Sequence, residues 1–275
     1  MEYTNLAYVV AAVLFIIGIK RLGSPKTAQS GNTIASIGML IAIIATVASF
    51  DLLDFKLIAI GMIIGSIIGA TFAIRVQMTQ MPQMVAIFNG FGGGASALVA
   101  ASEFFTKHGT ADLNTFISGT IILSVFIGTL TFSGSFIAFG KLQGFVSGKP
   151  VVFTGLQILN SLMVISILLM GTFITLGVNQ DLNLFYGIVV LAILLGITLT
   201  IPIGGADMPV VISLLNSYSG IAASATGFVL MNNGLIISGA LVGASGLILT
   251  NIMCKGMNRS LANVIFGAVG LEQET

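Results

Sequence analysis

The sequence predicts an all-α fold, a polytopic membrane bundle of nine transmembrane helices, and three observations lead to it. Of its 275 residues, 56% are hydrophobic and only 7% are charged, whereas soluble domains carry about 25% charged residues. Several stretches of about 20 residues or more lack any charge, which is enough to cross a bilayer as a helix. The 34 glycines exceed the usual proportion and favour close helix packing in lipid. This composition excludes a soluble enzyme, and a net charge of +1 gives no sign of a nucleic-acid partner.

The charge-free runs set the expected helices. The longest run, residues 208–254, would extend about 70 Å as one helix at ~1.5 Å per residue, twice the thickness of the hydrocarbon core. Asn232, Asn233 and Gly234 supply the turn that divides it. The nine expected helices cover residues 4–20, 31–50, 55–74, 82–103, 113–140, 153–177, 182–202, 209–230 and 234–256.

The placement of Lys and Arg predicts that the N-terminus faces outside and the C-terminus faces the cytoplasm, because cytoplasmic loops are enriched in these residues. In this orientation only two of the ten basic residues, Lys56 and Lys107, face outside. The eight on the cytoplasmic side are Lys20, Arg21, Lys26, Arg75, Lys141, Lys149, Lys255 and Arg259. We expect residues 1–260 to form one transmembrane domain.

Two helix pairs repeat when the sequence is shifted by 127 residues. The matched residues include Met81 with Met208, Pro82 with Pro209, Asn89 with Asn216 and Gly93 with Gly220. Apolar helices also match by coincidence, which is the alternative. A true repeat would be parallel, and transporters place their sites at repeat interfaces near the middle of the membrane.

Asn89 and Asn216 are the candidate polar groups inside the membrane. Each lies seven residues after its proline, or about 10 Å along a helix. An amide without partners costs several kcal/mol in lipid, so both should face the bundle interior. There they either hold helices together by hydrogen bonds or line a hydrated path.

Small and polar residues form stripes on three of the expected helices. These stripes indicate either a narrow water chain between the helices or simple packing seams. Ser135 belongs to one stripe, and Ser217 lies beside Asn216 in another. Two further series are interpreted as packing glycines: Gly61, Gly65 and Gly69, and Gly239, Gly243 and Gly246.

Three segments carry a family resemblance: MPQMVAIFNGFGG at 81–93, GGADMPVVISLLNSYSG at 204–220 and MCKGMNRS at 253–260. They resemble the membrane domain of the beta subunit of proton-translocating NAD(P) transhydrogenase, and the resemblance covers essentially the whole chain. It implies a subunit of a translocase that couples hydride transfer between NADH and NADP⁺ to proton passage across the bacterial cytoplasmic membrane. The hydride-transfer sites, and the NAD(H) and NADP(H) that they bind, would lie outside this segment.

The resemblance also implies partners. They are an alpha subunit with membrane and NAD(H)-binding parts, an NADP(H)-binding domain, and a second copy of the protomer. Residues 261–275 are then expected to begin the linker to the NADP(H)-binding domain, which is absent from this chain.

Residue by residue, Asn89, Ser135 and Asn216 match proton-path positions of the family. Many members have histidine where this chain has Asn89, and asparagine does not titrate. We therefore expect the titrating group on a helix of another chain.

Three residues are expected at the inner loops that face the NADP(H) domain: Asp207, by its match to a family position, and Arg75 and Lys141, by their placement. The alternative for Asp207 is a carboxylate that stabilises a helix N-terminus. Gly239, Gly243 and Gly246 match a family glycine series on the last helix. The rival functions are a stand-alone secondary transporter or channel for a small polar solute, and a purely structural scaffold.

Overall fold

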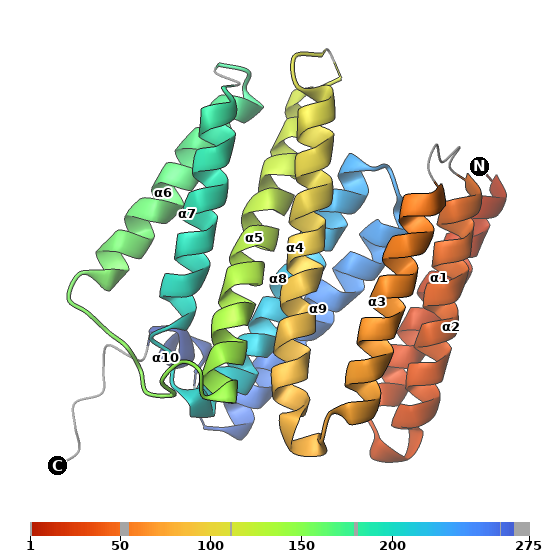
Figure 1. Cartoon of the computed structure of the whole chain (residues 1–275), viewed down its shortest axis with the longest axis horizontal. Helices are drawn as coiled ribbons and strands as arrows, with labels where there is room; N and C mark the ends of the chain where they lie inside the picture. Colours follow the sequence, from red (N-terminus) through yellow and green to blue (C-terminus); the bar gives the residue numbers. More distant parts are fainter. Residues whose placement is uncertain (1, 50–54, 111, 179–180, 259, 267–275) are drawn as a thin grey trace. The chain divides into compact units, whose positions relative to one another are not determined.

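The computed structural model describes residues 2–49, 55–110, 112–178, 181–258 and 260–266. Within these residues the chain forms α-helices and two short 3-10 turns, without a strand (Figure 1). Nine of the described helices are long and apolar enough to cross a membrane. The predicted all-α class and the nine spans are therefore confirmed, whereas the orientation of the termini stays a prediction.

The helices follow one another along the chain with short connections. Their bounds are α1 Glu2–Leu22, α2 Pro25–Ser49, α3 Phe55–Arg75, α4 Met81–Lys107, α5 Thr115–Gln143, α6 Leu156–Thr175, α7 Leu182–Thr200, α8 Met208–Val229, α9 Asn233–Gly256 and α10 Leu261–Phe266. The 3-10 turns η1 (Met78–Gln80) and η2 (Gly205–Asp207) precede α4 and α8.

The chain divides into two compact units. The first comprises residues 1–80 with 233–238, and the second comprises residues 81–232 with 239–275. In the first unit α1 packs along α2 (Figure 1). A Cβ atom on Gly31 would lie 2.8 Å from the carbonyl oxygen of Gly18, so the absence of side chains lets these two backbones touch.

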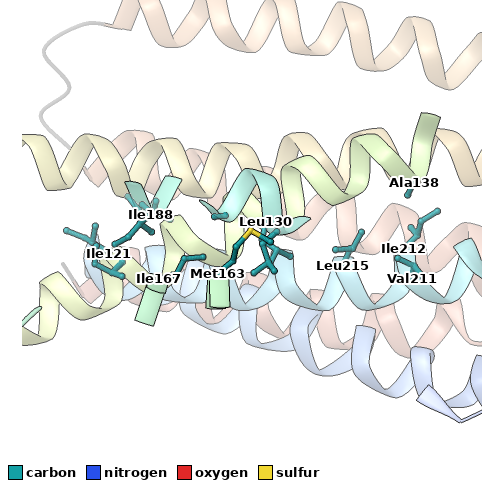
Figure 2. Packing of buried hydrophobic residues seen from close by; sticks show 14 of the residues in the cluster. Ile121, Leu130, Ala138, Met163, Ile167, Ile188, Val211, Ile212 and Leu215 are labelled. Atoms are coloured by element: carbon teal, nitrogen blue, oxygen red, sulfur yellow. The ribbon is translucent and has the colours of Figure 1, made fainter. Parts of the chain in front are cut away.

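Helix α5 lies at the centre of the second unit, where it contacts α4, α6, α7 and α8. Apolar side chains from α5, α6, α7 and α8 pack together in the space between these helices, as in the close-packed interiors of proteins. Figure 2 shows this core, with Ile121, Leu130 and Ala138 of α5, Met163 and Ile167 of α6, Ile188 of α7, and Val211, Ile212 and Leu215 of α8.

Local sequence explains where two of the helices begin and one ends. Asn114 caps α5 because its side-chain oxygen accepts a hydrogen bond from the backbone N–H of Ile117. At the other end of α5, Gly144 adopts φ +84°, which glycine tolerates without strain. Asp181 caps α7, and hydrogen bonds from the backbone and side chain of Asn183 hold the pKa of its carboxyl below the usual value.

The predicted start of the second helix was wrong by six residues, since α2 begins at Pro25 instead of residue 31. The prediction placed the start of this helix beyond Lys26, the last charged residue before the apolar segment. A helix needs only its own backbone hydrogen bonds, so it can extend past the apolar segment, and proline suits the first turn.

The internal repeat reappears in the starts of the elements. Helix α3 begins at Phe55 and α7 at Leu182, η1 spans Met78–Gln80 and η2 Gly205–Asp207, and α4 begins at Met81 and α8 at Met208. Each pair differs by 127 residues. This agreement of helices, turns and boundaries supports a true repeat over coincidence.

Part of the expected linker is helical. Residues 261–266 form α10, and Val264 on this short helix is 4% exposed. Helix α10 contacts α8 within the second unit. Residues 267–275, and Arg259 from the charge count, lie outside the described residues.

Candidate functional site

Asn89 is buried at the junction of α4, α5 and α8, with 8% of its surface exposed. Its amide Nδ2 donates to Ser135 Oγ at 2.9 Å, and its Oδ1 accepts from Ser219 Oγ at 2.8 Å. The three side chains form one hydrogen-bonded chain across three helices. The structure therefore brings together Asn89 and Ser135, both selected from the sequence.

Ser219 was missed by the sequence reasoning, although it lies three residues after Asn216, on the same face of α8. Asn216 itself is half-buried, and its side-chain amide forms no hydrogen bond with the described part of the chain. Asn216 and Asn89 are therefore not bonded directly to each other. They lie at equivalent positions, each eight residues after the first residue of its helix.

Ser217 lies on a different side of α8. It is fully buried, and its hydroxyl donates to the carbonyl oxygen of Gly243 in α9 at 2.6 Å. Ser213, one turn earlier, donates in the same way to Gly246 at 3.2 Å. Each helical residue is rotated about 100° from the one before it. Ser217 therefore points away from Ser219, two residues later, and does not share the Asn89 cluster.

A second polar cluster occurs further along the same three helices. The hydroxyls of Ser124 in α5 and Thr226 in α8 lie 2.6 Å apart, and both side chains are buried. Thr226 Oγ1 also approaches the carbonyl oxygen of Ser96 in α4 at 3.3 Å, and Ser124 Oγ donates to that of Ala222 at 3.0 Å. The sequence reasoning singled out neither of the two hydroxyl groups that meet there.

Glycines bring α8 and α9 into backbone contact. A Cβ on Gly220 would collide with the backbone nitrogen of Gly243. One on Gly239 would lie 2.5 Å from the Ser224 nitrogen, and one on Gly246 would lie 2.8 Å from the Ser217 nitrogen. Gly61, Gly65 and Gly69 on α3 differ, because a Cβ on any of them meets no described atom within 4 Å.

The three residues expected at the inner loops have different surroundings. Lys141, at the end of α5, is 5% exposed. Its Nζ donates to the carbonyl oxygens of Lys149, Ile201 and Ile203 at 3.1, 2.5 and 2.8 Å. Asp207, in the same unit, is half-buried at the last position of η2, directly before α8. Arg75 is the exposed last residue of α3 in the other unit.

The described residues contain neither a phosphate loop at the glycine run of α4 nor a cluster of metal-binding side chains. Gly92, Gly93 and Gly94 lie inside α4 and not in a loop after a strand. No group of three His, Cys, Asp or Glu side chains in the described part of the chain is arranged to hold a metal ion.

The fold and these clusters define a multi-pass helical membrane protein whose buried polar side chains meet between packed helices. A comparison with protein families identifies which one. The family described as NAD(P) transhydrogenase beta subunit matches this sequence over residues 4–275. The chain therefore belongs to this family. The resemblance stated from the sequence motifs is confirmed.

Two curated relatives support the assignment. Both are named NAD(P) transhydrogenase subunit beta and come from Rhodospirillum rubrum, one from the strain ATCC 11170. Each is 46% identical over 274 residues, which is 98% of this chain and 59% of the relative. The chain thus spans about three fifths of the length of these curated relatives.

Proposed function

We propose that this chain is the proton-translocating membrane part of an NAD(P) transhydrogenase. In the complete complex it would couple hydride transfer between NADH and NADP⁺ to proton passage across the membrane. The observation that carries the proposal is the chain from Ser219 through Asn89 to Ser135, a row of hydrogen-bonding groups across three helices of a member of this family.

Asn89 would orient the path without carrying the charge. Its Oδ1 accepts and its Nδ2 donates, and a neutral amide does not titrate near pH 7. It can therefore fix the direction in which neighbouring hydroxyls and water point. We assign the titrating step to a side chain of another subunit, and histidine suits it because its pKa of about 6.5 lies near the working pH.

Asn216 would extend the path beyond the Asn89 cluster. Its half-buried amide lies one helical turn from Ser219 and keeps its hydrogen-bonding groups available for water. Ser217 would contribute indirectly, because its hydrogen bond to Gly243 holds α8 against α9. The close packing at Gly239, Gly243 and Gly246 would support the same helix pair.

The complete protein would need partners in this proposal. NAD(H) and NADP(H) bind to soluble parts outside this segment, supplied by an alpha subunit and by an NADP(H)-binding domain joined through residues 261–275. Two protomers would assemble in the bacterial cytoplasmic membrane, with the N-terminus of this chain outside. Asp207, Lys141 and Arg75 would form or support the surface that senses the NADP(H) domain.

A solute transporter is the less favoured reading. Such a protein needs a cavity for its solute near the paired asparagines. A pocket of about 880 Å³ is lined by residues of the α5–α6 loop, α6, α7 and Pro202. None of its lining residues comes from α4 or α8.

The test is Asn216→Leu in the complete complex, reconstituted into vesicles. Loss of a positioned group in a proton path should lower proton-coupled turnover by about tenfold or more, while hydride exchange in the soluble domains persists. Asn160→Leu is the matched control, since Asn160 is an asparagine of α6 outside this path. Unchanged proton pumping by Asn216→Leu rejects the role of Asn216 in the path, and an unaltered complex that moves no protons during hydride transfer rejects the proposed function.

A further inference from the structure

The two polar clusters lie on opposite sides of a tight helix crossing. A Cβ on Gly93 of α4 would lie 2.9 Å from the carbonyl oxygen of Gly128 in α5, and one on Gly128 would lie 2.6 Å from that of Gly93. Asn89 precedes the crossing by four residues and Ser96 follows it by three. Direct backbone contact at this point leaves no room for water between α4 and α5.

Thr131 of α5 lies at this crossing. Its Cβ and Cγ2 would be 3.0 and 3.1 Å from a Cβ on Gly93. Ser135, of the first cluster, is one turn away in one direction, and Gly128 is one turn away in the other. Ser124, of the second cluster, lies seven residues from Thr131, about 10 Å along the helix.

The hydroxyl of Thr131 differs from those of several other threonines in the helices. The side chain is fully buried, yet Oγ1 has no hydrogen-bond partner in the described part of the chain. Thr120, Thr172 and Thr198 instead donate to carbonyl oxygens of their own helices. A buried hydroxyl without a partner costs about 1–3 kcal/mol, so a packing role alone would be served better by valine.

We infer that Thr131 is a proton relay that joins the two clusters when the α4–α5 crossing opens, an inference that rests on the proposed function. Water entering the crossing would give Oγ1 its missing partners. Oγ1 would accept a proton from the side of Ser135 as its own hydrogen leaves to water on the side of Ser124. The hydroxyl is neutral before and after. In the closed crossing, the break in the hydrogen-bonded chain between the two clusters prevents passive leakage of protons.

The experiment compares Thr131→Val with Thr131→Ser in the complete complex in vesicles. Valine keeps the shape and removes the hydroxyl, so proton-coupled turnover should fall about tenfold, with no decrease in the unfolding temperature and with hydride exchange preserved. Serine restores the hydroxyl and should restore most of the coupled turnover, a rescue that a packing role does not predict.

Ser118→Ala is the matched control. Ser118 is also a buried hydroxyl of α5 without a hydrogen-bond partner among the described residues, but it lies outside the two clusters. Its loss should leave proton coupling unchanged. The inference is overturned if Thr131→Val pumps like the unaltered complex, or if Ser118→Ala loses as much.

The two proposals fail in different ways. If Asn216→Leu abolishes coupled pumping while Thr131→Val does not, the relay is rejected and the proposed function stands. If the unaltered complex moves no protons during hydride transfer, the function itself is rejected and the relay with it.

Discussion

The ammonium group of Lys141 is held by backbone oxygens alone. Three carbonyls accept its hydrogen bonds, from Lys149 in the α5–α6 loop and from Ile201 and Ile203 after α7. The same two segments also pair through the backbone, because the N–H of Gly205 donates to Gly148 at 2.9 Å. Lys141 therefore fixes the loops next to Asp207.

Replacing Lys141 with methionine should destabilise the protein by about 2 kcal/mol, because hydrogen bonds from a charged donor contribute about 1.5–3 kcal/mol and the carbonyls are left without a donor. Thermal unfolding in detergent measures the loss. The exposed Lys149 offers the control, because it accepts the Lys141 hydrogen bond through its backbone carbonyl, which Lys149→Met keeps. This variant should change stability by less than about 0.5 kcal/mol. Equal effects of both variants would contradict this role.

For single residues, the sequence predicted which side chains lie in the polar clusters better than it predicted their hydrogen-bond partners. Asn89 could be selected because few amides occur inside the apolar spans, and Ser135 because it belongs to a stripe of small and polar residues and matches a family position. The sequence placed Ser217 beside Asn216 in a stripe without indicating its partner, and its hydroxyl bonds to Gly243 of α9. Helical periodicity gives the face on which a residue lies, but not which neighbouring helix covers that face.

Among the elements, the pair α8 and α9 depends most directly on glycine. Gly220 allows the backbone of Gly243 to approach, and this approach brings the hydroxyls of Ser213 and Ser217 within reach of carbonyl oxygens on α9. Hydrogen bonding across helices and close packing thus support each other.

Gly220→Ala should destabilise the protein by about 1–3 kcal/mol, because an added methyl group forces two packed backbones apart. Denaturation in detergent provides the measurement. Gly92→Ala is the control on α4, since a Cβ there meets no described atom within 4 Å. This control should be neutral or stabilising by up to about 1 kcal/mol, the difference in helix propensity. A stable Gly220→Ala protein would show that the contact is not needed.

The elements themselves were largely predictable, because a span of apolar residues has only one common structure in lipid. The eighth helix, expected at 209–230, occurs at Met208–Val229. The main error is at the polar start of α2, and the expected linker contains the short helix α10. Both segments lie where the apolar signal stops, so the sequence pattern carried no information about their helices.

On the scale of the whole molecule, the asymmetry of basic residues sets the expected orientation. Eight of ten Lys and Arg residues fall on one side when the nine spans alternate, and such bias directs insertion. The nine spans follow from the structure, but the side on which each end lies depends on the membrane, and only the charge pattern addresses it.

Cysteine labelling in intact cells tests this orientation. Cys254 is the single cysteine of the sequence and is buried, so Cys254→Ala gives a background without reactive thiols. Thr110 follows α4 and Ser147 follows α5, and both are exposed. On that background, Thr110→Cys should react with an impermeant maleimide from outside, and Ser147→Cys only after the cells are opened. The reverse pattern would place the Asp207 end of α8 outside, where no cytoplasmic nucleotide-binding domain could reach it, and would overturn the proposed coupling surface together with the orientation.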